Sequence, residues 1–137
     1  MEKIKFYIIF LVFITSCKDD DVDGSLLLIN DSDKNVYFYC FQDYPLMHYP
    51  DTILPVERPY GMQFIKKNGA SGKFTNPSWD NIYSQLPDGK FSMYVFDADL
   101  VDAVPWSKIK SNYRVLQRFD LTLYDLQNSN YTIKYSE

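Results

Sequence analysis

Short runs of apolar residues alternate with turn-forming residues over most of the chain. The clearest case is residues 131–135, which read Tyr-Thr-Ile-Lys-Tyr and place apolar and polar side chains on opposite faces of a strand. Residues 91–96 follow a strong Pro-Asp-Gly-Lys turn and place Phe91, Met93 and Val95 on one face. This period of two predicts a domain built mainly from β-strands.

The first strands are predicted at residues 25–29 and 36–41, with the turn-forming residues 30–35 between them. This order predicts an opening hairpin. Both faces of the second strand are apolar, which is typical of a central strand or of a strand that presents tyrosines on its second face. Further short strands are predicted at residues 52–54, 62–66 and 113–119, and a loop is predicted at residues 67–72.

Helix signals are few. Residues 105–112 predict a short helix with Pro105 at its first position, where the missing N–H costs nothing. Thr122 and Asp125 have the spacing of a capping box, with Asp in place of Glu, and predict a helix of one or two turns. Residues 79–86 are compatible with a strand or with a helical turn, and both remain open.

Many short strands with little helix predict a mainly all-β fold. The expected architecture is an antiparallel β-sandwich, immunoglobulin- or prealbumin-like, with one or two short helices near the C-terminus. A small barrel is the alternative. The chain of 137 residues has room for one such domain, which we assign to residues 25–137.

The beginning of the chain has a different pattern, in which two lysines precede the apolar residues 6–15. A membrane-spanning helix needs about 20 apolar residues, so this run is interpreted as part of a signal peptide, residues 1–16. The segment Ile14-Thr15-Ser16-Cys17 resembles a lipobox, which implies that Cys17 carries acyl chains that anchor the protein. A cleaved, unlipidated signal with an incidental cysteine is the alternative.

The lipidated cysteine and an acidic tether are assigned to residues 17–24. Within them, Lys18-Asp19-Asp20-Asp21 resembles the surface-export signal of Bacteroidetes lipoproteins. The resemblance implies a lipid-anchored protein of the outer membrane that faces the cell surface. A solvated tether is the simpler interpretation of the same charges. Residues 18–24 can hold the domain at most about 23 Å from the bilayer.

The net charge of −4 limits the partners that the domain can bind. A mildly acidic surface argues against nucleic acid and against docking on anionic lipid headgroups through basic residues. The expected partners are the membrane, through the lipid anchor, and a protein or glycan at the membrane surface. No cofactor is predicted.

Histidine and cysteine counts restrict the possible chemistry. His48 is the single histidine, and its proline-rich surroundings contain nothing that resembles a nucleophile elbow. With Cys17 acylated, Cys40 has no disulfide partner and is interpreted as a small buried hydrophobe. One histidine and one free cysteine exclude zinc sites made from these residue types. We therefore predict no catalytic residue and no enzymatic activity, with a hydrolase as a distant alternative.

Three aspartates after the strand at residues 91–96 are the weak candidates for a metal site. Asp97-Ala98-Asp99 resembles the nucleophile strand of haloacid-dehalogenase phosphotransferases, but the residues that follow do not form the βαβ units of that fold. A calcium site from Asp97, Asp99 and Asp102 is a second interpretation, although the glycine and closing glutamate of a calcium loop are missing. A strand that passes into a polar turn and a helix explains the same residues.

Aromatic residues offer a binding interpretation, because exposed rings stack on sugars or anchor a partner. Packing in the core and at its rim is the simpler explanation. The weak ligand-binding candidates are Tyr37, Tyr39, Trp79 and Trp106, within a wider set that also includes Tyr44, Tyr49 and Tyr60.

The C-terminal third of the chain is similar to a group of Bacteroidetes outer-membrane lipoproteins with no assigned activity. The similarity rests on residues 95–99, 106–113, 115–122 and 131–133, together with residues 33–38. It implies a fold and a location and leaves the activity open. We expect a membrane-anchored, non-enzymatic structural or interaction module, with a glycan- or peptide-binding accessory lipoprotein as the alternative.

Overall fold

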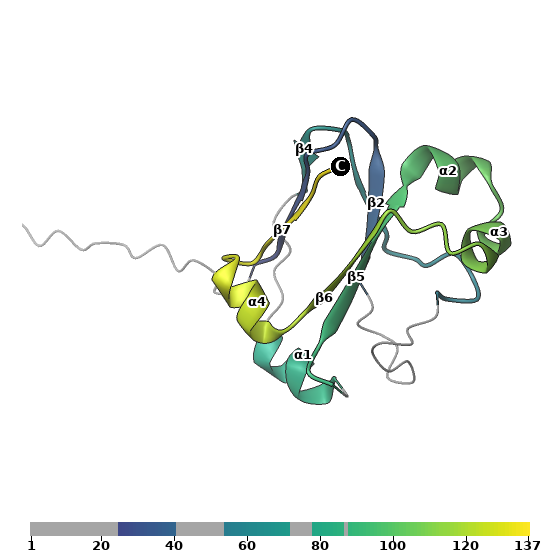
Figure 1. Cartoon of the computed structure of the whole chain (residues 1–137). Helices are drawn as coiled ribbons and strands as arrows, with labels where there is room; N and C mark the ends of the chain where they lie inside the picture. The colour runs from purple at the N-terminus through teal and green to yellow at the C-terminus, as the bar shows by residue number, and fades with distance from the viewer. Residues whose placement is uncertain (1–24, 41–53, 72–77, 87) are drawn as a thin grey trace, which may run out of the picture.

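Two β-sheets dominate the computed structural model, which describes residues 25–40, 54–71, 78–86 and 88–137 (Figure 1). One sheet has the strand order β4-β1-β7, and the other has the order β3-β2-β5-β6. The described part of the chain is therefore mainly β, as the period of two predicts. The strands are β1 (Leu27–Asn30), β2 (Val36–Cys40), β3 (Gln63–Ile65), β4 (Gly69–Ala70), β5 (Phe91–Asp97), β6 (Gln117–Leu121) and β7 (Thr132–Tyr135).

Four short helices lie in the described residues: α1 (Trp79–Gln85), α2 (Ala98–Ala103), α3 (Trp106–Ser111) and α4 (Leu123–Asn128). The helices α3 and α4 agree with the two predicted near the C-terminus, except that Pro105 is the N-cap of α3 and precedes its first turn. The full capping box of α4 is present, with Thr122 and Asp125 bonded to each other's backbone N–H. None of the described helices is long and apolar enough to cross a membrane.

The helix α1 resolves the open alternative for residues 79–86. Ser78 caps it by accepting a hydrogen bond from the N–H of Asn81 at 3.1 Å. Trp79 and Tyr83, four residues apart, share one face of the helix and are both buried. A capped N-terminus and an apolar helical face therefore decide between the two structures.

The first core lies between the two sheets. Leu28 on β1 and Ile133 on β7 share a buried cluster with Phe38 on β2. The predicted face of β5 is confirmed, because Phe91, Met93 and Val95 belong to the same cluster. Its further members are Leu26, Val36, Ile65, Trp79, Tyr83, Leu126 and Tyr135.

A second core covers the other face of the four-stranded sheet. Tyr94 and Phe96 of β5 are fully buried there, with Val101 of α2 and Ile109 of α3 packed in the same cluster. Figure 1 shows α2 and α3 on this side of the sheet. Residues 91–96 are therefore buried on both faces. Full burial of each large side chain contributes about 1.5–3 kcal/mol. The strand β2 lies between β3 and β5, so its prediction as a central strand is confirmed.

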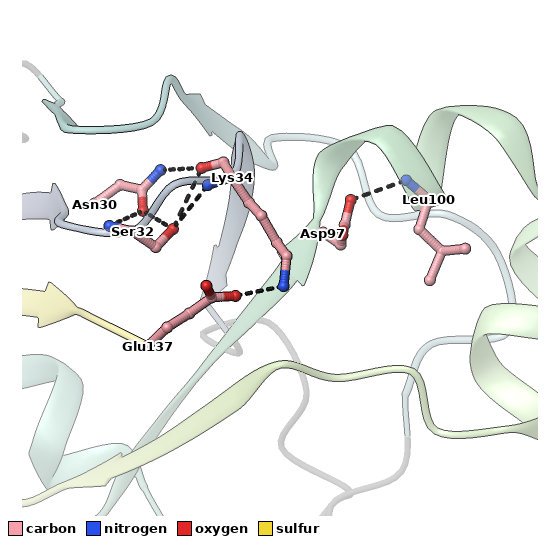
Figure 2. Close-up of polar contacts among 6 residues, drawn as sticks. All are labelled: Asn30, Ser32, Lys34, Asp97, Leu100 and Glu137. Atoms are coloured by element: carbon pink, nitrogen blue, oxygen red, sulfur yellow. Dashed lines mark hydrogen bonds and ion pairs between the residues drawn. The ribbon is translucent and has the colours of Figure 1, made fainter.

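The predicted opening hairpin is wrong, because β1 and β2 lie in different sheets. The strand β1 pairs in parallel with β7, with Leu28 opposite Ile133, and β2 pairs antiparallel with β5. The turn-forming residues 31–35 therefore connect one sheet to the other. Inside this connection the buried side chain of Asn30 donates to the carbonyl of Lys34 at 2.7 Å (Figure 2).

Two segment boundaries also differ from the prediction. The strand β6 starts at Gln117, later than the predicted strand at residues 113–119, because Tyr113 has a φ of +48° and Arg114 donates to the carbonyl of Ile109 at 2.9 Å. The predicted loop at residues 67–72 contains β4. A Cβ atom at position 69 would lie 2.8 Å from the carbonyl oxygen of Lys66, so this strand needs glycine there.

Candidate functional site

Three polar side chains from β2, α2 (Ala98–Ala103) and the segment before β3 contact one another. Nη2 of Arg58 lies 2.8 Å from Oδ1 of Asp102, which is on α2. The hydroxyl of Tyr37, on β2, donates to the carboxylate of Asp102 at 3.2 Å and 3.3 Å from its two oxygens. The guanidinium carbon of Arg58 lies 5.2 Å from the centroid of the Tyr37 ring. Each side chain of this group therefore contacts the other two.

Two hydrogen bonds between side chains and the backbone position the segments that carry Asp102 and Arg58. Asp97 caps α2 by accepting a hydrogen bond from the N–H of Leu100 at 3.1 Å, and so sets the start of the helix that carries Asp102 (Figure 2). The segment that carries Arg58 is fixed where the indole N–H of Trp106 donates to the carbonyl of Pro55 at 2.9 Å. Both attachments lie within a few residues of the group that they position.

One apolar side chain packs on the polar group, and two more lie close to Arg58 in the sequence. The ring of Phe64 on β3 stands edge-on to the ring of Tyr37, with 5.5 Å between centroids, because the two residues are paired across the strands. Phe64 is 48% exposed, Val56 is 79% exposed and Tyr60 is 97% exposed. Tyr60 precedes Gly61, whose φ of +82° allows the chain to turn there. We call these residues the edge surface: Tyr37, Val56, Arg58, Tyr60, Phe64 and Asp102.

The edge surface has the chemistry of a binding site. A guanidinium group has five N–H donors and a carboxylate has about four acceptor sites, so the bonds within the group leave donors and acceptors for a ligand. Both side chains remain partly exposed to solvent. Single exposed apolar residues are common, but here Phe64 packs on Tyr37 of the polar group, and Val56 and Tyr60 lie two residues before and after Arg58.

The calcium interpretation of Asp97, Asp99 and Asp102 is not supported by their positions. Asp97 is engaged as the cap of α2, Asp99 lies in the first turn of that helix, and Asp102 pairs with Arg58. In the described ranges, no three histidine, cysteine, aspartate or glutamate side chains are grouped so that they can hold a metal ion. The explanation as a strand that passes into a helix fits these contacts.

The four aromatic candidates do not form one surface. Trp79 is buried in the first core, where its ring lies 5.7 Å from that of Phe91. Tyr39 is buried in the second core, and Trp106 packs edge-on against Phe96 with its N–H bonded to Pro55. Tyr37 alone among the four belongs to the edge surface.

Three residues of the edge surface, Val56, Arg58 and Phe64, are not singled out by any pattern in the sequence. A usable signal exists in the order Arg58-Pro59-Tyr60-Gly61, because a proline and a glycine on either side of a tyrosine favour a turn that exposes it. The pairing of Tyr37 with Phe64 and the ion pair with Asp102 join residues 27 and 44 positions apart, and such contacts leave no local pattern.

A second polar group lies on β5 and β6. Asp120 accepts hydrogen bonds from the hydroxyl of Ser92 at 2.7 Å and from Nε of Arg118 at 2.8 Å. The guanidinium of Arg118 also lies 5.6 Å from the centroid of the Tyr94 ring. These groups satisfy one another and are mostly shielded from solvent, so they stabilise the pairing of the two strands.

Cys40 ends β2 and packs against the first core. Burial raises the pKa of its thiol to about 12, so the thiolate is scarce at neutral pH. This position agrees with its interpretation as a small hydrophobe.

The remaining predicted residues lie outside the described residues, as does most of the strand predicted at residues 52–54; they are Cys17, Lys18 to Asp21, Tyr44, His48 and Tyr49. The edge surface is therefore the candidate site that the described part of the chain offers. In comparisons of the chain with protein-family models, with curated proteins and with solved structures, nothing matches.

Proposed function

We propose that this chain is a lipid-anchored, non-enzymatic interaction module of the outer membrane, and that it faces the cell surface. The lipobox-like segment that ends at Cys17 supports the anchor, and the acidic cluster Asp19 to Asp21 supports export to the surface.

For the architecture, we propose the antiparallel β-sandwich of immunoglobulin- or prealbumin-like type. The support is that side chains of both sheets enter one core cluster, as the facing sheets of a sandwich require. The parallel pairing of β1 with β7 is a departure from a purely antiparallel arrangement. The layer of α2 and α3 is an addition on the outer face of the four-stranded sheet (Figure 1).

The proposal of an interaction role is based on the edge surface. Tyrosine and arginine are the residue types that dominate binding energy at protein surfaces, and both are present here. The surface includes residues of β2, β3 and α2, whereas the residues that follow the tether enter β1 of the other sheet. The tether therefore precedes a strand of the sheet that does not carry the edge surface.

A glycan- or peptide-binding accessory lipoprotein is the second candidate. The exposed rings of Tyr60 and Phe64 beside a charged pair favour it, because aromatic faces and hydrogen-bonding groups are combined in one place.

The experiment that tests the proposal combines labelling and crosslinking in cells that export the full chain. Radiolabelled palmitate should enter the wild type and the Cys40→Ala control but should not enter Cys17→Ala, which should leave the membrane fraction. A photo-crosslinking residue at position 60 should then capture a partner on intact cells, and the same residue at position 124 should not. Labelling of Cys17→Ala, or equal capture from both positions, would overturn the proposal.

A further inference from the structure

We propose that the edge surface is a binding site for neutral carbohydrate. The inference rests on the proposed function, since it takes the edge surface as the place where the module binds. It adds the chemical class of the ligand and the residues that recognise it. Three features of the surface lead to this class: its charge, its pattern of donors and acceptors, and its exposed rings.

The charge of the surface argues against an anionic ligand. Arg58 is the one cation within residues 54–65 and α2, and it is already paired with Asp102. An acidic sugar, a phosphate or an acidic peptide would have to compete with that carboxylate and would also meet Asp99 and Glu57, which are both exposed. A ligand with no net charge avoids both costs.

The polar group matches hydroxyl groups. A hydroxyl both donates and accepts a hydrogen bond, so neighbouring hydroxyls on a sugar ring need donors and acceptors side by side. Arg58 offers N–H donors, Asp102 offers carboxylate lone pairs, and the hydroxyl of Tyr37 accepts beside them, all within one set of contacts at 2.8–3.3 Å. Because these side chains are already held by one another, a ligand gains their hydrogen bonds with little further ordering.

The rings of Phe64 and Tyr60 supply the apolar half of the site. A sugar ring is amphipathic, with C–H groups on its faces and hydroxyls around its edge, and aromatic rings are large apolar surfaces with little conformational freedom. Phe64 is held edge-on by Tyr37, and Tyr60 extends almost fully into solvent two residues after Arg58. The sugar face can therefore rest on a ring while its edge reaches the polar group.

An extended peptide fits the surface less well. A peptide that adds a strand to an exposed sheet edge gains its affinity from main-chain hydrogen bonds. The strand β3 has only three residues, Gln63–Ile65, so it offers few such bonds. Peptide binding is therefore the competing outcome of the test.

The test uses the full lipidated chain, purified in detergent and applied to an array of neutral and anionic oligosaccharides and to a displayed peptide library. We expect binding to neutral oligosaccharides. In titrations with the strongest of them, Tyr60→Ala and Asp102→Asn should each weaken binding about tenfold or more. Tyr124→Ala is the matched control, because Tyr124 is 69% exposed on α4 and should bind as the wild type does.

Three outcomes would overturn the inference: no binding to neutral oligosaccharides, stronger binding to anionic ones, or binding that is unchanged by both edge-surface variants. Circular dichroism of each variant excludes a loss of fold as the cause of weaker binding. Crosslinking from position 60 separates this failure from failure of the proposed function. Capture of a peptide or protein from position 60 without oligosaccharide binding would contradict the carbohydrate proposal and still support the interaction module. Absence of both capture and oligosaccharide binding would contradict both proposals.

Discussion

The side-chain amide of Asn30, at the end of β1, donates a hydrogen bond to the carbonyl oxygen of Ile65, at the end of β3, at 3.2 Å. The same amide nitrogen also donates to the carbonyl of Lys66 at 3.0 Å. Its oxygen accepts from the backbone N–H of Ser32 at 3.2 Å and from the hydroxyl of Ser32 at 2.7 Å. Because β1 and β3 belong to different sheets, this fully buried residue joins the two sheets by polar contacts.

Replacing Asn30 with alanine should lower the free energy of unfolding by about 2–4 kcal/mol. The change removes several buried hydrogen bonds and leaves carbonyl groups without their donor. Urea denaturation followed by circular dichroism measures the loss. Asn35→Ala is the control, because Asn35 accepts one exposed hydrogen bond from the N–H of Lys67 and should cost about 1 kcal/mol or less. Equal losses of stability in both variants would show that the buried contacts of Asn30 between the two sheets add no stability beyond that of an exposed hydrogen bond.

The connection at residues 31–35 also illustrates what the sequence can predict. Turn composition between two apolar runs correctly places a reversal after β1, but a reversal does not choose the partner strand. That choice depends on β7, which lies about a hundred residues further along the chain and pairs with β1 in parallel. Hairpin prediction uses only neighbouring residues, so it fails wherever a strand pairs with a partner that is distant in the sequence.

Features with a local cause are predicted well. The face of β5 that carries Phe91 and Met93 follows from the period of two, and the capping box of α4 follows from a spacing of three residues. The candidate site is predicted only in part. Tyr37 and Asp102 are named separately, for stacking and for calcium, and Arg58, which joins them, is missed. Their meeting depends on how α2 and the segment before β3 pack on β2.

The stability of α4 should depend on acidic pH through Asp125. The hydrogen bond from the hydroxyl of Thr122, followed by the bond from its backbone N–H, lowers the pKa of this carboxyl below its ordinary value. A carboxylate with a lowered pKa stabilises the folded state above the pKa of the unfolded chain, and this contribution is lost as the pH falls through the lower folded-state pKa. The wild type should therefore have a higher free energy of unfolding than Asp125→Asn at neutral pH, and this difference should disappear below about pH 4.

Thermal denaturation of the wild type and Asp125→Asn between neutral pH and pH 2 measures this dependence. Thr122→Ala removes the other half of the capping box and should cost about 1 kcal/mol at neutral pH. Asp88→Asn, in an exposed turn, is the control for the removal of one surface carboxylate. A difference in stability between Asp125→Asn and the wild type that stays the same at every pH would contradict the role of the ionised form of Asp125.

The thiol of Cys40 should react slowly in the folded protein. Burial raises its pKa to about 12, so the thiolate at pH 8 is about a thousandfold scarcer than for an ordinary cysteine. The Cys17→Ala variant leaves Cys40 as the single thiol, and its alkylation by iodoacetamide can be followed by mass spectrometry. The same variant in guanidinium chloride is the control and should react at the ordinary rate. Equally fast alkylation in both states would show that the thiol is accessible and ionised.

Exchange of Asp19, Asp20 and Asp21 for alanine should keep the protein inside the outer membrane. Protease added to intact cells should therefore digest the wild type and spare the variant, as judged by antibody detection of the domain. Asp23→Ala is the matched control, because it removes one acidic residue of the same tether outside the cluster and should leave the protein exposed. Lysed cells should lose all three proteins to the protease. Protection of the wild type on intact cells would exclude surface display, and digestion of the variant would show that the acidic cluster serves only as a solvated tether.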